Sequence, residues 1–452
     1  MTTRLKSLIL LPVVFAVGVV TAHAQDAPGN GFEKDSTEVR ALDEVVVSAP
    51  KVLHKADMDL FIPSTDTKAL SKNGMQLLQN LRIPSVTVNE VLGTVSSLGG
   101  AVEIRINGRV ASVDQMKALS PDDIKRVEWI ENPGLKYKGA NAVINLIVRN
   151  RGLGGSLMAQ AMPALNTPWG QGNASIKLNN GKSQWGVDLT GKVTDVNVYR
   201  DYYERFTYPD GNRLIRAESP LGGKVKENNA RATLSYSYIK PDTTVIYASL
   251  SGFRNFATGE DYRGLLTLSD GSDKIAVRDK DNSHGFTPSA SLYVEQHLAK
   301  NRILAIDAGT SYYRGFAGHN HAENEAESGN MITDVNTRIR DRNYSYAIEA
   351  NYTEQWRRSR FTAGVSYNGS SNQSNYENLG GEKYHQNQNH VYFFGEYMQM
   401  IDKVTLTGGV GAQYSSFNIR ETGVGSNSWN LRPRLTLSYS PGNVSRWSLA
   451  VY

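Results

Sequence analysis

From residue 151 onward, large apolar residues alternate with small or polar ones over long stretches of the chain. In FTAGVSY (361–367) the odd positions carry Phe, Ala, Val and Tyr, and the even positions carry Thr, Gly and Ser. The pattern recurs at 232–238, 404–414 and 434–439. Because successive side chains of a strand point to opposite faces, the alternation predicts strands with one apolar and one polar face. A sandwich or propeller fits it, and so does an outer-membrane β-barrel with lipid outside and a polar lumen.

The spacing of turn sequences distinguishes these folds. Short turns are expected at NNGK (179–182), KPDT (240–243), LAKN (298–301), RRSR (357–360), MIDK (400–403) and SPGN (440–443). More polar connections lie between them at YPDGNR (208–213), SDGSD (269–273), AESGN (326–330), LGGEK (379–383) and GVGSN (423–427). The strands of each hairpin are then much longer than the ~5–6 residues of ordinary sheets. Long hairpins with short turns at one end favour the mainly β, antiparallel transmembrane barrel, and aromatic residues near strand ends fit an interfacial girdle: Trp185, Trp356, Trp429 and Trp447.

The number of strands predicts that part of the barrel is missing. We expect about 13 strands in 151–452, whereas bacterial single-chain barrels close with an even number. A 14-stranded barrel has a backbone radius of roughly 14 Å, and its inward side chains reduce the lumen radius to about 8 Å. The ~100 residues before the barrel, folded as a compact domain, have a radius of gyration of ~13 Å and do not fit in it. A 22-stranded barrel holds such a domain, so we expect a C-terminally incomplete chain lacking about nine strands. The alternative is a natural end at Tyr452, since many barrels end on an aromatic residue.

Residues 50–150 have the sequence pattern of a small α+β domain. MQLLQNL (75–81) has helical spacing, with Ser71 as its expected N-cap. Strands are expected at SVTVN (85–89), AVEIRING (101–108) and AVINLIVR (142–149). SPDDIKRVEWI (120–130) is expected to begin as a short helix, because Ser120 is a suitable cap and Pro121 suits the first helical position.

The N-terminus indicates export. Residues 1–24 form a signal peptide with basic Arg4 and Lys6, an apolar stretch from Leu8 to Val20, and an Ala22-His23-Ala24 cleavage site before a polar linker at 25–40. The chain has no cysteine, which excludes disulfides, thiolate metal sites and a lipoprotein anchor. The net charge of +5 gives no reason to expect nucleic acid as a partner.

Residues 41–150 resemble the N-terminal part of TonB-dependent outer-membrane receptors. DEVVVSA (43–49) resembles their TonB box, and the plug domain is resembled by LLQNLRIPSVTVN (77–89), VEIRINGR (102–109), IKRVEWIENPG (124–134) and YKGANAVINLIVR (137–149). Asn141-Ala142 departs from the family, which often has a glycine there. The resemblance implies that the TonB-binding residues are Asp43, Glu44, Val45, Val46, Val47, Ser48 and Ala49.

The resemblance also implies a function. Such a receptor lies in the Gram-negative outer membrane and imports a bulky, scarce nutrient, such as siderophore-bound iron, cobalamin, haem or a glycan, when TonB displaces its plug. The implied partners are the periplasmic TonB complex, outer-membrane lipid, a nutrient ligand at the extracellular face and a surface lipoprotein lid. No cofactor is expected. The alternatives are a barrel that binds or adheres without transport, and a non-functional fragment.

The sequence contains few other candidate sites. His319, His321 and Glu323 share one face if their segment is extended, and they are weak candidates for binding a divalent cation; a solvated, charged loop stem is the simpler interpretation. The basic residues Lys136, Lys138, Arg149 and Arg151 are expected to line the contact between plug and wall rather than a ligand. No nucleophile, base and orienting group can be assembled, so no catalytic residue and no enzyme activity is predicted, and the substrate-binding residues are unknown.

Overall fold

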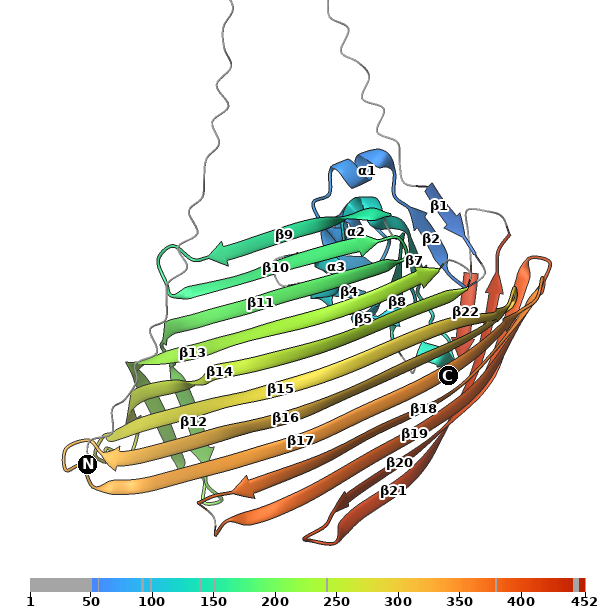
Figure 1. Ribbon diagram of the computed structural model, residues 1–452. Helices are drawn as coiled ribbons and strands as arrows, with labels where there is room; N and C mark the ends of the chain where they lie inside the picture. The colour runs from blue at the N-terminus through green and yellow to red at the C-terminus, as the bar shows by residue number, and fades with distance from the viewer. Residues whose placement is uncertain are drawn as a thin grey trace, which may run out of the picture. The chain divides into compact units, whose positions relative to one another are not determined.

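The computed structural model describes residues 51–55, 57–90, 93–97, 100–137, 140–149, 152–240, 243–378, 380–441 and 447–451. All of these residues belong to one compact unit, Ser48–Tyr452. The predicted signal peptide, the polar linker and the TonB-box-like residues 43–49 lie outside the described residues. The described part consists of a small domain followed by a wall of long strands (Figure 1).

A mixed β-sheet forms the centre of the small domain. Its strands are β1 (Lys51–His54), β2 (Asp59–Ile62), β3 (Val86–Asn89), β4 (Thr94–Ser97), β5 (Gly100–Ile106), β6 (Arg109–Val110), β7 (Ile124–Ile130) and β8 (Ala142–Val148). They lie in the order β1-β2-β7-β8-β5-β4-β3, with β6 beside β5 and with β5 parallel to β8. The helices are α1 (Thr65–Ala69), α2 (Gly74–Asn80) and α3 (Val113–Lys117), with short 3₁₀ turns η1 (Pro121–Asp123) and η2 (Leu135–Tyr137). The expected α+β domain is therefore present.

The core of this domain lies between α2 and the sheet. Met75, Leu77 and Leu78 of α2 are at most 1% exposed, and they pack with buried residues of β7 and β8 such as Val127 and Ile144. Apolar residues at positions 75, 77 and 78 give α2 one apolar side, which the sheet covers. Burial of that side stabilises a helix too short to persist alone in water.

The predicted N-cap of the helix at 75–81 was wrong. The N-cap of α2 is Asn73, whose side-chain oxygen accepts the backbone N–H of Gln76 at 2.8 Å, because the helix begins two residues later than the predicted cap allows. Ser71 instead donates to the carbonyl of Thr67 in α1 at 2.7 Å.

The prediction for 120–130 is confirmed in part, since the segment begins with the short 3₁₀ turn η1 and has Pro121 at its first position. The helical geometry ends after Pro121–Asp123, Ser120 makes no side-chain capping bond, and β7 follows at once. Pairing of β7 with both β2 and β8 overrides the helix-start signal, because it buries Ile124, Val127 and Trp129.

The wall is one antiparallel sheet in which chain neighbours pair. Its strands are β9 (Leu153–Pro163), β10 (Trp169–Asn180), β11 (Ser183–Val198), β12 (Tyr202–Thr207), β13 (Arg213–Lys240), β14 (Thr244–Leu268), β15 (Ile275–Ala299), β16 (Arg302–Glu325), β17 (Met331–Gln355), β18 (Ser359–Tyr376), β19 (Glu382–Ile401), β20 (Val404–Ile419), β21 (Val424–Tyr439) and β22 (Trp447–Val451). Thirteen of them follow one another from β9 to β22, and β12 pairs with β13 beside this path. The predicted long hairpins and strand number are confirmed, as are the turns that lie wholly within the described residues. The turns predicted at 240–243, 379–383 and 440–443 include residues outside the described part. Among the described strands, β9 and β22 lie at the two ends of the order.

One strand differs from the expectation. The segment between the turns at 179–182 and 208–213 was expected to be continuous, but it is divided into β11 and β12. β12 pairs only with β13, in a hairpin from Tyr202 to Glu218. We call this the outer hairpin.

The two faces of the wall have different chemistry. Tyr293 of β15 approaches the small domain, where its hydroxyl is 3.0 Å from the position that a side chain on Gly108 would occupy, so odd residues of β15 face inward. Its register partner Asp307 places odd residues of β16 on the same face. Even residues therefore face outward, and Leu292 of β15 is 44% exposed there.

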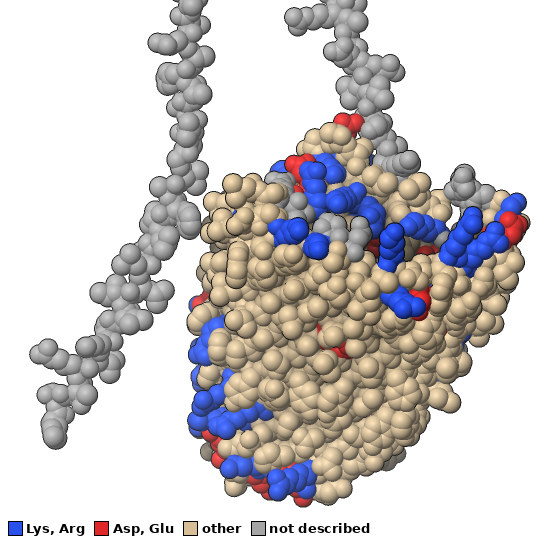
Figure 2. All heavy atoms as spheres, turned by 45° about the vertical axis from the view of Figure 1, so that its right-hand side comes forward, with Lys and Arg blue, Asp and Glu red and all other residues tan. Residues whose placement is uncertain are grey.

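A charge-free belt crosses the outward face. On β16 it extends from Leu304 to Tyr312, with Arg302 and Arg314 at its two ends. At ~3.3 Å per residue and a tilt of ~40°, this stretch spans roughly 20 Å, close to the ~25 Å apolar band of outer-membrane barrels. Figure 2 shows the same division, since Lys, Arg, Asp and Glu gather toward the two ends of the wall and the broad band between them is almost free of charge. No helix within the described residues is long and apolar enough to cross a membrane.

Candidate functional site between the small domain and the wall

The small domain contacts the inward face of the wall near the short turns. One group of contacts involves α3 and the turn before it. The Arg109 guanidinium lies 3.5 Å from the centre of the Tyr247 ring, and the Gln115 side chain donates to the Tyr247 hydroxyl at 3.0 Å. Lys177 of β10 donates to the carbonyl of Ala118 at 2.5 Å. These polar contacts connect the domain to the beginning of the wall.

A second group of contacts holds residues Asn132–Tyr137, which we call the docking segment. Glu396 of β19 accepts the backbone N–H of Leu135 at 3.1 Å. Arg434 of β21 donates to the carbonyl of Asn132 at 3.1 Å and also to that of Pro133. Because a guanidinium presents a planar fork of donors, one side chain satisfies two neighbouring carbonyl groups of an otherwise irregular segment.

Close packing accompanies these hydrogen bonds. A methyl group on Gly134 would lie 2.6 Å from the Glu396 carboxylate, so the segment approaches this closely only because residue 134 is glycine. Leu135 packs between Tyr392 and Phe394 of β19, and all three are less than 10% exposed. The contact thus combines a small apolar anchor with two buried charged side chains, Glu396 and Arg434.

A third contact joins the start of the small domain to the wall. Arg360 of β18 and Asp57, which precedes β2, form an ion pair with a 2.5 Å separation. Both side chains are about one quarter exposed, at 24% and 27%. A single, partly exposed ion pair of this kind contributes on the order of 1 kcal/mol. The N-terminal contact is therefore weaker than that of the docking segment.

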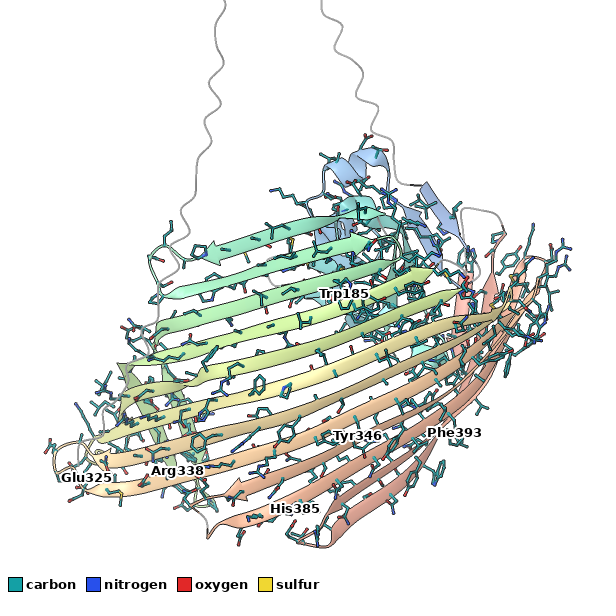
Figure 3. All side chains as sticks on the ribbon, in the orientation of Figure 1. Trp185, Glu325, Arg338, Tyr346, His385 and Phe393 are labelled. Carbon is teal, nitrogen blue, oxygen red and sulfur yellow. The ribbon has the colours of Figure 1, made fainter. Side chains whose placement is uncertain are left out.

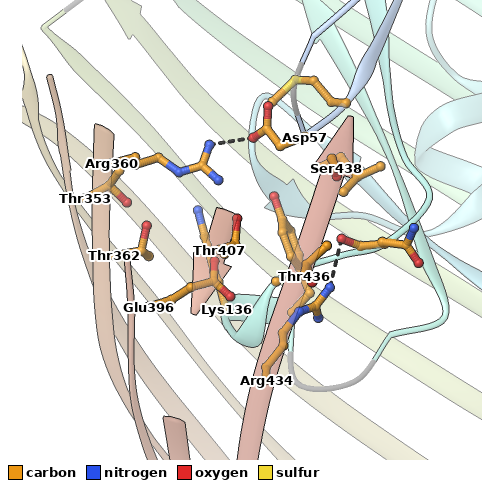
Figure 4. Close-up of a pocket in the computed structure, with 15 residues that line it drawn as sticks. Asp57, Lys136, Thr353, Arg360, Thr362, Glu396, Thr407, Arg434, Thr436 and Ser438 are labelled. Carbon is orange, nitrogen blue, oxygen red and sulfur yellow. Dashed lines mark hydrogen bonds and ion pairs between the residues drawn. The ribbon is translucent and has the colours of Figure 1, made fainter. Parts of the chain in front are cut away.

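A cavity of about 170 Å³ lies among these contacts (Figure 4). The docking segment forms one side, and inward residues of β17 to β21 form the other. Hydroxyl groups line much of the wall side, from Thr353, Thr362, Thr407, Thr436 and Ser438. The Thr436 hydroxyl is buried and has no hydrogen-bond partner among the described residues. The volume and the polar lining are suited to water.

Lys136 is the unusual residue of this cavity. Its side chain keeps some surface toward the cavity but is enclosed by protein. Burial lowers the pKa of Lys136 to about 8, and the nearby Arg105 acts in the same direction, while Glu295 and Glu349 oppose them. Burial also raises the pKa of Tyr137 to about 12. The docking segment thus keeps an ammonium group in an unfavourable position, at a contact where the small domain meets the wall.

The weak metal candidates lie far from this contact, on the inward face of β16. His321 contacts Asp279 at 2.5 Å and Glu323 at 3.4 Å, and His319 contacts Asp281 at 2.6 Å. The described part of the chain contains no group of three or more His, Cys, Asp or Glu side chains arranged to hold a metal ion. The predicted common face is present, but its residues take part in ion pairs.

Two of these acidic residues, Asp279 and Glu323, also form ion pairs with arginines of the outer hairpin and of the segment before it. Arg216 of the hairpin contacts Glu323 at 2.6 Å, although β13 and β16 are three strands apart and thus about 14 Å apart in a flat sheet. Arg200, just before the hairpin, contacts both Glu218 at 3.0 Å and Asp279 at 2.7 Å. The sheet must therefore curl inward at this corner.

Sequence reasoning missed the principal residues of the contact. Of the four basic residues expected there, Lys136 lines the cavity, Arg149 lines a neighbouring pocket, and Lys138 and Arg151 lie outside the described residues. One sequence pattern does point to Arg434 and Glu396: the alternation places these two charged residues on the inward face of strands that are otherwise largely apolar. Their partners in the docking segment are separated from them by about 260 to 300 positions, which no local pattern reveals.

Comparisons with known proteins add the following. No protein-family model and no curated protein sequence matches this chain. Among solved structures, the chain is similar to the ferric citrate transporter FecA in the unliganded form, with 10% identity, 88% of this chain and 73% of that chain covered, and a TM-score of 0.38. It is also similar to the ferric-catecholate import receptor Fiu from E. coli K12 in its open form, with 10% identity, 89% and 81% covered, and a TM-score of 0.34. The copper transporter OprC gives 11% identity, the same coverage and a TM-score of 0.34.

The chain itself defines an architecture: a curved antiparallel wall with a small domain on one face of it (Figure 1). The domain has its own core and is docked on the polar inward face of the wall, whose outward face carries the apolar belt.

Proposed function

We propose that this chain is a TonB-dependent receptor of the Gram-negative outer membrane that imports a bulky, scarce nutrient. The observation that carries the proposal is the docking of the small domain. A few polar contacts hold the domain against a polar surface, and such contacts exchange readily with water when the domain moves. A domain held in this way serves as a removable plug.

The belt supports the location. Outward residues of β16 and β17 form an uncharged stretch of the length that outer-membrane barrels use, with tyrosines at its outer edge at Tyr312 and Tyr344. The inward face carries hydroxyl, amide and charged groups instead. Lipid outside and water inside explain both compositions.

Energy coupling would act through residues 43–49. This TonB-box-like segment directly precedes β1 in the sequence, and among the described strands β1 pairs only with β2, at the edge of the plug sheet. An extended segment binds a partner by adding a strand to its sheet, with main-chain hydrogen bonds supplying the affinity. Tension applied to 43–49 would then act first on β1 and next on the partly exposed Asp57–Arg360 ion pair.

The expected partners are those that the resemblance to TonB-dependent receptors implies. They are the periplasmic TonB complex, outer-membrane lipid around the belt, the nutrient at the long-loop end, and a surface lipoprotein lid there. The nutrient belongs to the group of siderophore-bound iron, cobalamin, haem and glycans. We infer no catalytic role for any residue.

Deletion of residues 43–49 in the full chain tests the proposal. We expect uptake of the cognate nutrient to stop while binding of the nutrient to cells is retained. Deletion of seven linker residues, 28–34, is the matched control and should leave uptake intact. Unchanged uptake after the first deletion would refute TonB coupling. A chain that binds the nutrient or attaches to cells without any uptake, before or after the deletion, would instead be a binding or adhesion protein without active transport.

A further inference from the structure

A row of arginine residues crosses the outward face just beyond the belt. The register pairs Arg254 of β14 with Phe286 of β15, Phe286 with Arg314 of β16, and Arg314 with Arg342 of β17. All three arginines are exposed, and alternation points them outward. Strand spacing of ~4.8 Å places the first and last about 14 Å apart. We call Arg254, Arg314 and Arg342 the arginine row.

The arginine row has no acidic partner among the described residues. Neighbouring basic residues do have one: Arg278 contacts Asp261 at 3.0 Å, and Arg340 contacts Glu377 at 2.5 Å. Arg314 and Arg342, in contrast, stand directly opposite each other on adjacent strands. Like charges in this arrangement destabilise a sheet, so the row is unfavourable unless an anion lies between the guanidinium groups.

The position of the row relative to the belt indicates the kind of anion. Tyr312 and Tyr344 are the next outward residues toward the belt on β16 and β17, about 7 Å along the strand from Arg314 and Arg342. Aromatic residues of this kind mark the level of lipid head groups. Figure 3 shows the sequence of levels on β17, with Arg338 toward the long-loop end and Tyr346 within the belt. The arginine row therefore lies at head-group level.

We propose that the arginine row binds the phosphate groups of a phosphorylated glycolipid whose acyl chains lie on the belt. Arginine binds phosphate through two parallel hydrogen bonds, which suits a fixed row better than lysine would. Three guanidinium groups spread over about 14 Å match a head group with two phosphates better than a single free phosphate ion. The proposal rests on the membrane location given under the proposed function and is independent of TonB coupling.

Binding is tested with the full chain purified in neutral detergent. The probe is diphosphoryl lipid A, compared with monophosphoryl lipid A and inorganic phosphate, and native mass spectrometry counts the bound molecules. We expect one tightly bound diphosphoryl lipid and weaker binding of the monophosphoryl form. Inorganic phosphate at the same concentration should leave no adduct. Equal binding of free phosphate and lipid would overturn the lipid assignment.

Substitutions locate the site. The double variant Arg314→Gln/Arg342→Gln should bind diphosphoryl lipid A about tenfold or more weakly, because it loses charge-assisted hydrogen bonds. Arg302→Gln is the matched control, since it removes the same kind of charge from the outward face at the opposite edge of the belt, and it should bind as the unaltered chain does. Arg342→Lys keeps the charge but loses the fork, and its binding should be intermediate.

A second measurement separates binding from folding. Without lipid, Arg342→Gln should raise the melting temperature, because it relieves the repulsion with Arg314. With diphosphoryl lipid A, the unaltered chain should gain more in melting temperature than the variant does. Equal gains in both proteins, or equal lipid affinity in the double variant and the Arg302→Gln control, would overturn the proposal. A chain that stays soluble without detergent would refute the membrane location itself, a distinct result from loss of TonB-dependent uptake.

Discussion

Arg434 donates hydrogen bonds to the carbonyl groups of Asn132 and Pro133, residues that precede it by 302 and 301 positions. Replacement by Met would leave two carbonyl groups of the docking segment without their donor, at a cost of about 1–3 kcal/mol each where water cannot reach them. We expect faster amide hydrogen exchange in Asn132–Tyr137 and little change in the core around α2. Arg434→Lys should have a smaller effect, because the charge remains and only the fork is lost. Unchanged exchange in Arg434→Met would show that the docking segment does not depend on this contact.

Gly134 provides a test of close approach. Gly134→Ala places a methyl group 2.6 Å from the Glu396 carboxylate, so the Leu135–Glu396 hydrogen bond should lengthen or break. A loss of about 1–3 kcal/mol is typical of such overpacking. Gly395→Ala on β19 is the control, because a methyl group there would meet no atom within 4 Å. Limited proteolysis near residue 134 should accelerate in the first variant only, and equal rates in both would refute the assigned role of Gly134.

Lys136 predicts a dependence of stability on pH. Its pKa is about 8 in the folded protein and 10.5 in the unfolded chain, so between these values the unfolded chain binds more protons. The free energy of unfolding should therefore rise as pH increases from about 8 to 10.5, and the full penalty remains below pH 8. Lys136→Met should remove this rise and stabilise the protein at pH 7 by on the order of 2 kcal/mol. Thermal unfolding at a series of pH values measures both effects, and an identical pH profile in the variant would contradict the prediction.

His321 predicts the opposite dependence for the outer hairpin. It lies beyond the belt, and its hydrogen bond to Asp279 raises the pKa of His321 above 6.5. A raised pKa contributes stability that is complete below the unfolded value of 6.5 and is lost as pH rises through the folded value. After correction for the intrinsic pH dependence of amide exchange, the protection of 202–218 should fall over that range in the unaltered chain, by an amount equivalent to about 1 kcal/mol or less. His321→Gln should make this corrected protection independent of pH, whereas the same substitution at His319 should not.

Much of the wall could be predicted from the sequence, because a period of two and regularly placed turns are local signals. The turn at 179–182 separates β10 from β11 as expected, and Val365 lies on the outward face that alternation assigned to it. Antiparallel hairpins need only chain neighbours to pair, so local order also fixed the topology.

The parts that could not be predicted depend on distant residues. Pairing with β2 and β8 decided that 124–130 is a strand, and the cap of α2 depended on where packing began the helix. The contact between plug and wall joins Leu135 to Glu396 and Asp57 to Arg360, pairs that no repeating pattern connects. Ion pairs between non-adjacent strands could not be predicted either, because Arg216 reaches Glu323 only where the sheet curls.

The length of the strands has a consequence for the route of a ligand. On β16 the belt ends at Tyr312, and the strand continues to Glu325, which adds about 40 Å along the strand beyond the lipid. Under the proposed function, this part of the wall would extend well beyond the outer surface of the membrane. An arriving molecule would first meet the ends of these strands, where Arg200 and Asp279 form an ion pair, and would reach the plug only later. In that case, selection of the cargo and release of the plug are separate events that occur at two different distances from the membrane.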